Sequence, residues 1–242
     1  MRSYVTEGVT AKVRAAGGEI YAISSEPQAL SARAASEWQL DFETVGDPHQ
    51  EISAACSERG WLDLFVNERL GFLQASAAAA DWAPTHPKGY FQPGVLALSA
   101  KGRVLYRWRG VPTRGNMGGA VERPTAEHVW TTVARALEPG GDTQDAALDS
   151  DPPLDSRGIP WPIFAALLIA NGGFMAARGF KSPKRVINAG LRLLGFIGAW
   201  IAAFTWLPAL PVAVVLAAWV VYITPKVRWV SGEFQSVEAS SL

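Results

Sequence analysis

Few side chains in this sequence could carry covalent or metal chemistry. Cys56 is the only cysteine in the 242 residues, which excludes a disulfide within one chain and a zinc site built from cysteines. The histidines are His49, His86 and His128, and their spacing fits no metal-binding motif. Surface roles are the default for histidines placed in this way, so we expect neither a metal nor a cofactor. Cys56 is therefore the one candidate nucleophile.

Cys56 falls in a segment, residues 47–60, that the pattern predicts as a helix. Asp47 is a favourable N-cap residue, and Gly60 is typical of a helix end. Ile52 lies one helical turn before Cys56, so the two side chains share one face of this helix. A thiol in such an apolar stripe packs as a small hydrophobic residue. The core interpretation of Cys56 therefore competes with any redox role.

Alternating helix and strand patterns surround this segment. Apolar residues at helical or alternating spacing predict a first helix that ends before Gly17, then a strand at 19–24. A second helix begins after Ser25, where serine, proline and glutamine form a start signal. A short strand at 40–46 precedes the helix that carries Cys56. This order of elements is typical of an α/β domain.

The clearest pattern is a β-hairpin over residues 94–110, in which two apolar runs meet at a Lys-Gly turn. A helix follows at 124–137, and apolar residues recur along one of its faces. Arg107 and Arg109 alternate with aromatic residues in the second hairpin strand. This alternation predicts that both arginines face solvent.

Three of these segments resemble a known family. They are "GGEIYAISSE" (17–26), "LDFETVGDPHQEISAAC" (40–56) and "QPGVLALSAKGRVLYRWRG" (92–110). In order and spacing they are similar to the peroxiredoxin-like redoxins of the alkyl hydroperoxide reductase/thiol-specific antioxidant superfamily. The resemblance covers about residues 1–137. It implies an α/β, thioredoxin-like fold that lacks its first strand, because the sequence begins inside the first helix.

The resemblance also implies a chemistry. These redoxins place a peroxidatic cysteine at the start of the first helix, where the helix dipole favours the thiolate. Met1 stands at the corresponding place, so we expect either a shortened form of a longer protein or a degenerate member of the family. Some members carry a resolving cysteine on the helix that corresponds to residues 47–60, which gives Cys56 this role. A thiol reductant protein would then be a partner.

The remainder of the sequence differs in composition. Residues 138–157 form an acidic linker rich in proline and glycine, which predicts mobility. Residues 158–225 are largely apolar, and residues 226–242 form a polar tail. Since a spanning helix needs about 20 apolar residues, we expect an integral membrane protein with the lipid bilayer as a partner. The expected transmembrane helices, two or three in number, lie at about 160–178, 187–206 and 209–224.

Two functions of different classes follow from these patterns. The first is a membrane-anchored, peroxiredoxin-like thiol oxidoreductase that reduces hydroperoxides, and it predicts a reactive cysteine upstream of Met1. The second is a non-catalytic redoxin-fold module for binding or assembly on a membrane anchor, and it predicts that Cys56 is buried and unreactive. The 22 basic and 22 acidic side chains balance, so nucleic acid is not an expected partner.

Overall fold

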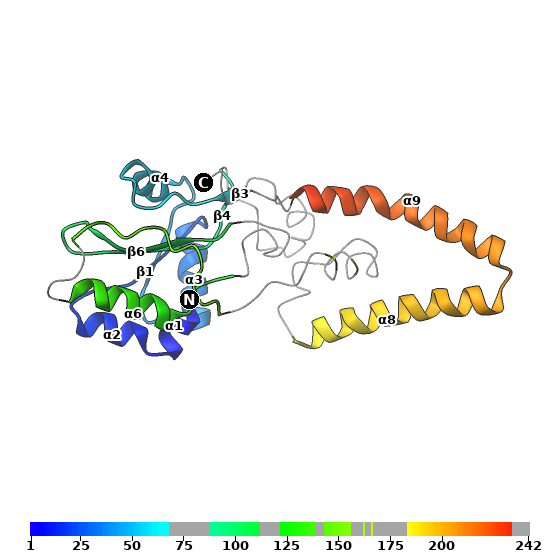
Figure 1. Ribbon diagram of the computed structural model, residues 1–242, viewed down its shortest axis with the longest axis horizontal. Coiled ribbons are helices and arrows are strands. Elements are labelled where there is room, and N and C mark those ends of the chain that lie inside the picture. Colours follow the sequence, from blue (N-terminus) through cyan, green and yellow to red (C-terminus); the bar gives the residue numbers. More distant parts are fainter. Residues whose placement is uncertain are drawn as a thin grey trace.

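The computed structural model describes residues 1–67, 88–111, 122–138, 143–155, 162, 166 and 183–233 (Figure 1). The helix expected at about 160–178 lies outside the described residues except at positions 162 and 166. The polar tail expected at 226–242 is described only up to Glu233, and this part is helical.

Two short helices open the chain where the sequence predicts one. They are α1 (Arg2–Thr6) and α2 (Val9–Ala15). Gly8 separates them with a φ of 70°, a left-handed conformation that glycine adopts readily and that interrupts a helix. Val9 and Thr10 are buried and anchor α2 against the rest of the domain.

A parallel pair of strands follows, joined by a crossover helix. Strand β1 (Tyr21–Ser24) pairs with β2 (Glu43–Gly46), with Tyr21 opposite Glu43 in the register. Helix α3 (Gln28–Trp38) makes the crossover that two parallel strands require. The side chain of Gln28 fixes this unit, because its Nε2 donates to the Thr44 carbonyl at 2.9 Å and its Oε1 accepts from the Gly46 amide at 2.6 Å.

Helix α4 (Glu51–Glu58) carries Cys56 and begins beside a buried carboxylate. Asp47 accepts hydrogen bonds from the backbone amides of Glu51 at 2.7 Å and Ser53 at 3.1 Å. These bonds satisfy donors that are otherwise unpaired at a helix start. The Asp47 side chain thus binds the first turn as predicted, but Gln50 is the N-cap residue and the helix begins at Glu51, later than the predicted start at residue 47. Beyond α4, β3 (Val66–Asn67) pairs in antiparallel fashion with β4 (Tyr90–Phe91).

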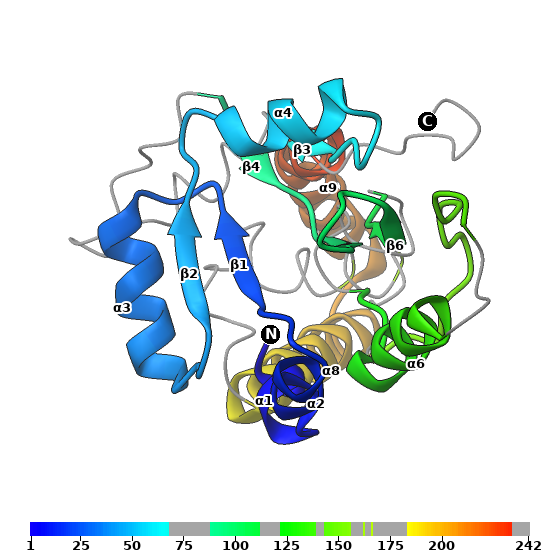
Figure 2. The ribbon, with the colours of Figure 1, turned by 90° about the vertical axis from the view of Figure 1, so that its left-hand side faces the viewer.

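The predicted hairpin is confirmed as β5 (Gly94–Leu98) and β6 (Val104–Arg109), an antiparallel pair. Helix α6 (Ala126–Leu137) packs against it. The core lies between them, where Tyr106 and Trp108 of β6 contact Val129 of α6. Figures 1 and 2 show α1, α2 and α6 on one side of the strands and α4 on the other.

The expected thioredoxin-like fold is not what the structure shows. The described strands form three separate two-stranded pairs, β1–β2, β3–β4 and β5–β6, and not one continuous sheet. The hydrogen bonds of β1 join it to β2, and those of β5 join it to β6, so the two longer pairs remain unconnected by strand pairing among the described residues. The fold is therefore a mixed arrangement of helices with small sheets.

Two long helices form a hairpin that extends away from the strands (Figure 1). They are α8 (Pro183–Trp206) and α9 (Ala209–Glu233). Among the described residues, neither these nor any other helix is both long enough and apolar enough to cross a membrane. The uncharged part of α8 begins only after Arg192, and that of α9 ends before Lys226, so each falls short of about 20 residues. This finding corrects the predicted transmembrane region and the predicted integral membrane location.

Candidate functional site

The predicted thiol, Cys56, lies in the C-terminal half of α4 and is half-buried. Its backbone carbonyl accepts hydrogen bonds from the amides of Trp61 at 3.0 Å and Leu62 at 3.4 Å, which close the end of the helix. The C-terminal end of a helix carries a partial negative charge. This position therefore disfavours a thiolate.

The surroundings of the Cys56 side chain also disfavour its thiolate form on balance. Burial raises the pKa of the Cys56 thiol, and the Asp47 carboxylate adds to this effect, while the Arg59 guanidinium opposes it. Since the thiolate is the nucleophile, Cys56 is less reactive than an exposed cysteine at neutral pH. Its role as a resolving thiol stays a prediction.

A second titratable cluster joins α6, β6 and the segment 143–155. Asp149 Oδ2 accepts from the Tyr106 hydroxyl at 3.0 Å and lies 2.8 Å from His128 Nε2. The Tyr106 ring meets the His128 ring edge-on, with 6.0 Å between the centroids. Burial, together with the hydrogen bond to Asp149, raises the pKa of Tyr106 above its ordinary value. Tyr106 therefore remains a neutral hydrogen-bond donor.

This cluster holds part of the predicted linker, which we call the strap (residues 143–155). The Ala146 amide donates to the Val104 carbonyl, and the Asp149 amide donates to the Arg107 carbonyl, both at 2.9 Å. The Asp145 carboxylate accepts from the Val104 amide at 2.7 Å. The strap thus covers the outer edge of β6 and is not the mobile linker that its composition predicts.

Sequence reasoning missed this cluster for a clear reason. His128 has the pattern of a surface residue on a helix, and Asp149 lies in a segment without periodicity. They are 21 residues apart in the chain, and no spacing rule connects them. Because Tyr106 and His128 both bind the Asp149 carboxylate, we interpret the cluster as a structural clasp that ties the strap to β6 and α6.

The two arginines of β6 do not face solvent as predicted. The Arg109 side chain is 7% exposed, and its Nη1 donates to the Asp63 carbonyl at 2.9 Å. Arg107 Nη1 donates to the Gly60 carbonyl at 2.8 Å. Both guanidinium groups bind the backbone that follows α4, so they fasten the Cys56 helix to the β5–β6 hairpin. The alternation of arginines and aromatic residues along β6 does place them on opposite faces of the strand. Both faces are covered, however, so the arginines do not reach solvent as predicted.

Strand β1, unlike β6, has exposed apolar side chains. In the described part of the chain this strand pairs with β2 on one edge only. Tyr21 is 57% exposed and Ile23 is 42% exposed, and the two lie on the same face because side chains alternate along a strand. Large apolar side chains beside an unpaired strand edge form a surface on which another strand can pair. We call Tyr21, Ile23 and this edge the open edge of β1.

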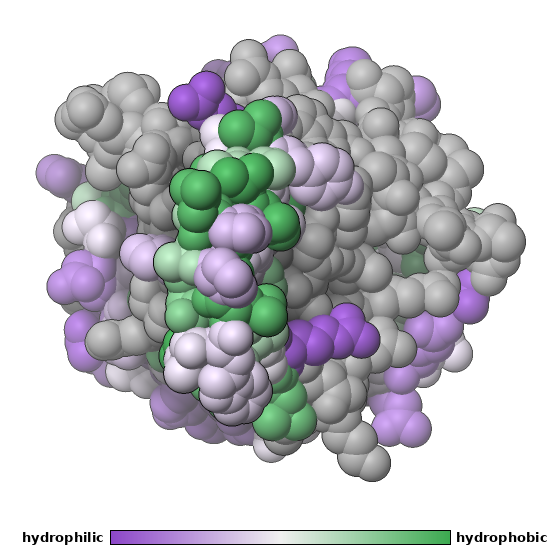
Figure 3. Space-filling model, turned by 90° about the vertical axis from the view of Figure 1, so that its right-hand side faces the viewer, coloured by the Kyte–Doolittle hydropathy of each residue, from purple (hydrophilic) through white to green (hydrophobic). Residues whose placement is uncertain are grey.

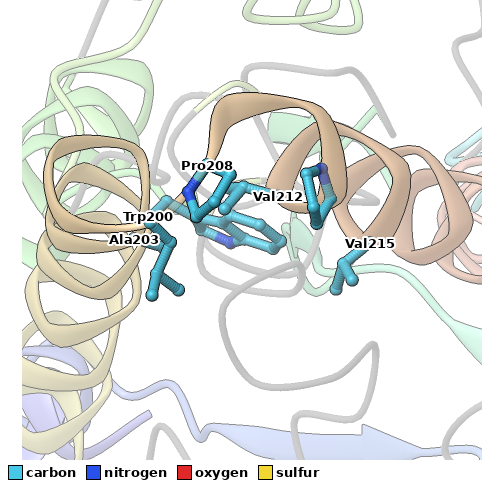
Figure 4. Close-up of a pocket in the computed structure, with 7 residues that line it drawn as sticks. Trp200, Ala203, Pro208, Val212 and Val215 are labelled. Carbon is cyan, nitrogen blue, oxygen red and sulfur yellow. The ribbon is translucent and has the colours of Figure 1, made fainter.

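One cavity lies at the connected end of the α8–α9 hairpin (Figure 4). Its volume is about 310 Å³, and every residue that lines it is apolar or aromatic. Trp200 and Ala203 contribute from α8, and Val212 and Val215 contribute from α9, with Pro208 at the turn between the helices. A cavity of this kind can take an apolar group but offers no charged side chain for catalysis.

Within the described residues, no group of histidine, cysteine, aspartate or glutamate side chains could hold a metal ion. The chain matches no protein family, no curated protein and no solved structure. The resemblance to peroxiredoxin-like redoxins therefore stays a prediction from three sequence segments.

Proposed function

We propose that this chain is a redoxin-related binding module that takes up an extended peptide segment along the open edge of β1. One observation carries the proposal. Tyr21 and Ile23 expose large apolar surfaces beside a strand edge that has no partner strand among the described residues. Folded proteins normally cover or charge such an edge.

The chemistry of an open edge defines how it binds. An added strand forms main-chain hydrogen bonds with the edge, and its alternate side chains pack on the exposed face. Here that face presents the Tyr21 ring and the Ile23 side chain, so the partner needs apolar residues at every second position. The partner is therefore an extended segment with alternating apolar and polar residues.

The charge near the open edge favours one kind of flank on the partner. Glu43 stands opposite Tyr21 in the register of β1 and β2, and it is exposed. Because β2 lies on the other side of β1, an added strand would run about 10 Å from Glu43, and only a long basic side chain reaching across Tyr21 would approach this carboxylate. Such a contact contributes to orientation more than to affinity, because exposed ion pairs are weak.

The proposal is tested with a fluorescein-labelled peptide of alternating valine and threonine that carries a lysine at each end. Fluorescence anisotropy measures its binding to the wild-type chain and to an Ile23→Lys variant. We expect the wild type to bind and Ile23→Lys to bind at least tenfold more weakly, because a lysine on an edge strand opposes pairing.

Leu137→Lys is the matched control, since Leu137 is an exposed apolar residue on α6, away from β1. Its affinity should equal that of the wild type. Circular dichroism checks that all three proteins have the same secondary structure. Failure of the wild type to bind the peptide, or equal losses in both variants, would contradict the proposal.

A thiol oxidoreductase is a second candidate, and one observation favours it. Cys56 is only half-buried and is not enclosed in the core. In this function Cys56 acts as a resolving thiol toward a sulfur that this chain does not contain. The raised pKa of Cys56 makes the exchange slow at neutral pH and faster as the pH rises.

This second candidate is tested with oxidised glutathione and intact-mass spectrometry. The Cys56 thiolate attacks the disulfide, forms a mixed disulfide and releases one molecule of glutathione thiolate. An adduct that forms within minutes at pH 8 and is lost in Cys56→Ser would support the redox function. A Cys56 that remains unmodified under these conditions would contradict it.

A further inference from the structure

The α8–α9 hairpin exposes an unusual amount of apolar surface. Between Leu193 and Pro225 the sequence contains no charged residue. Strongly exposed apolar side chains lie on both helices, among them Leu194 66%, Ile201 63%, Trp206 81%, Leu210 77%, Val214 61% and Val221 73%. Figure 3 looks onto the end of the hairpin and shows hydrophobic side chains gathered along it.

The two helices cover only part of this surface by contacting each other. The rings of Phe196 and Trp219 approach to 4.9 Å between centroids, and Val212 and Ile223 are buried. The Phe196–Trp219 contact joins α8 to α9. The side chains on the other faces have no covering element among the described residues.

The size of the uncovered surface matches that of a protein interface. If each large exposed side chain contributes roughly 100 Å², the hairpin presents on the order of 1,000 Å² of apolar surface. A monomer rarely exposes more than a few hundred Å² of continuous apolar surface. A standard interface buries about 800 Å² on each partner. The area is therefore sufficient for a stable dimer.

The connected end of the hairpin also carries a projection and a hollow. Trp206, the last residue of α8, is the most exposed of these side chains. The apolar cavity of about 310 Å³ lies close by, because Leu207, the residue after Trp206, lines it together with Val212 and others (Figure 4). A two-fold symmetric interface uses one surface on both copies, so this surface must contain both members of each contact. The end of this hairpin meets that requirement.

We propose that two copies of this chain associate through their α8–α9 hairpins, with Trp206 of each copy seated in the apolar cavity of the other. The complex is a four-helix arrangement in which the exposed faces of both hairpins cover each other. Its specificity comes from shape, because residues 193–225 contain no charged side chain. Tryptophan is also the residue type most often found at the energetic centre of an interface.

Sedimentation equilibrium of the full chain in detergent-free buffer tests the proposal. We expect a dimer at micromolar concentration. Trp206→Ala should raise the dissociation constant at least tenfold, because it removes the inserted side chain. Ala203→Phe should do the same from the other side of the contact, because its larger side chain fills the cavity.

Trp38→Ala is the matched control, since Trp38 is an exposed tryptophan on α3. Its dissociation constant should equal that of the wild type. A wild-type monomer at 100 times the tested concentration would overturn the proposal, as would a dimer that neither hairpin substitution weakens. Association of the wild-type chain into large oligomers of several sizes would also overturn it. So would a chain that stays monomeric and floats with phosphatidylcholine vesicles, because lipid would then cover the hairpin.

Discussion

At the scale of single residues, burial and hydrogen bonding decide what each polar side chain contributes. Tyr4 and Tyr106 both pack into the core around Trp108. The Tyr106 hydroxyl donates to Asp149, whereas the Tyr4 hydroxyl is buried without a hydrogen-bond partner in the described structure. A buried polar group without a partner contributes a cost, and a paired one contributes stability. The two tyrosines should therefore respond differently to the same substitution.

We predict that Tyr106→Phe lowers the free energy of unfolding by about 2 kcal/mol, because it leaves a half-buried carboxylate with one donor fewer. Tyr4→Phe should leave this free energy unchanged or raise it slightly. Urea unfolding at pH 7, followed by circular dichroism, measures both values. Equal destabilisation by the two variants would contradict the difference in pairing.

Tyr4 also predicts an alkaline loss of stability. Burial, with a smaller effect of Asp155, raises the pKa of Tyr4 to about 12, while a tyrosine in the unfolded chain ionises near pH 10. The folded state therefore holds its proton to higher pH than the unfolded state. The stability that is fully present below about pH 10 is lost as the pH rises to about 12. Urea unfolding across this range should show a smaller loss for Tyr4→Phe than for the wild type.

Arg109 tests whether a buried guanidinium stabilises through its backbone contact or through its ion pair. Its Nη1 donates to the Asp63 carbonyl at 2.9 Å and lies 3.4 Å from the Asp63 carboxylate, which is 70% exposed. We expect Arg109→Ala to lower the free energy of unfolding by about 2–3 kcal/mol. Asp63→Asn should cost about 0.5 kcal/mol or less, because exposed ion pairs are weak. A larger effect of Asp63→Asn would assign the stability to the ion pair.

At the scale of elements, the strap shows how a segment without helical or strand periodicity can still be ordered. It uses backbone groups that β6 leaves unpaired on its outer edge. Asp149 then fastens it through Tyr106 and His128, which lie on two different elements. The outer edge of β6 is covered in this way, while the other edge of β1 has no partner strand in the part of the chain that the structure describes. The difference between these two edges supports the binding proposed for β1.

We predict that Asp149→Ala loosens the strap. This substitution removes the acceptor of both side-chain bonds, so the amide of Ala146 should exchange its hydrogen at least tenfold faster. Hydrogen exchange measured by nuclear magnetic resonance reports this rate directly. Asp151→Ala is the control, because the exposed Asp151 lies on the same strap and contributes only its backbone amide to a hydrogen bond. Unchanged exchange at Ala146 in Asp149→Ala would show that the backbone bonds hold the strap without the clasp.

At the scale of the whole molecule, the strand-containing part and the helical hairpin present different surfaces. The former has charged side chains and a small core around Tyr106, and the latter is apolar on most of its exposed faces. Monomers rarely expose an apolar surface of this size, and one that is exposed usually marks an interaction site. Pairing of two hairpins would link the stability of the molecule to its concentration.

We therefore predict that the thermal midpoint of the wild type rises with protein concentration. Each tenfold increase should add about 1.4 kcal/mol per dimer to the free energy of unfolding, as mass action requires. Differential scanning calorimetry over a hundredfold range of concentration measures this shift. Trp206→Ala should make the midpoint nearly independent of concentration, whereas Trp38→Ala should behave as the wild type does.

Local patterns in the sequence predict several elements well. The helix that carries Cys56, the turn of the β5–β6 hairpin and helix α6 depend on residues close together in the chain, so their signals are visible without the fold. The candidate thiol also follows from the sequence, since Cys56 is the only cysteine. Its half-buried position and raised pKa do not, because they depend on what packs against α4.

The sequence by itself determined the local elements, the single thiol and the apolar character of residues 193–225. Each of these is a property of neighbouring residues. Only the tertiary structure decided that the strands form separate pairs, that Arg107 and Arg109 turn inward, and that Asp149 fastens the strap. These features join residues far apart in the chain, and their free energy comes from burial and contacts that no local pattern encodes.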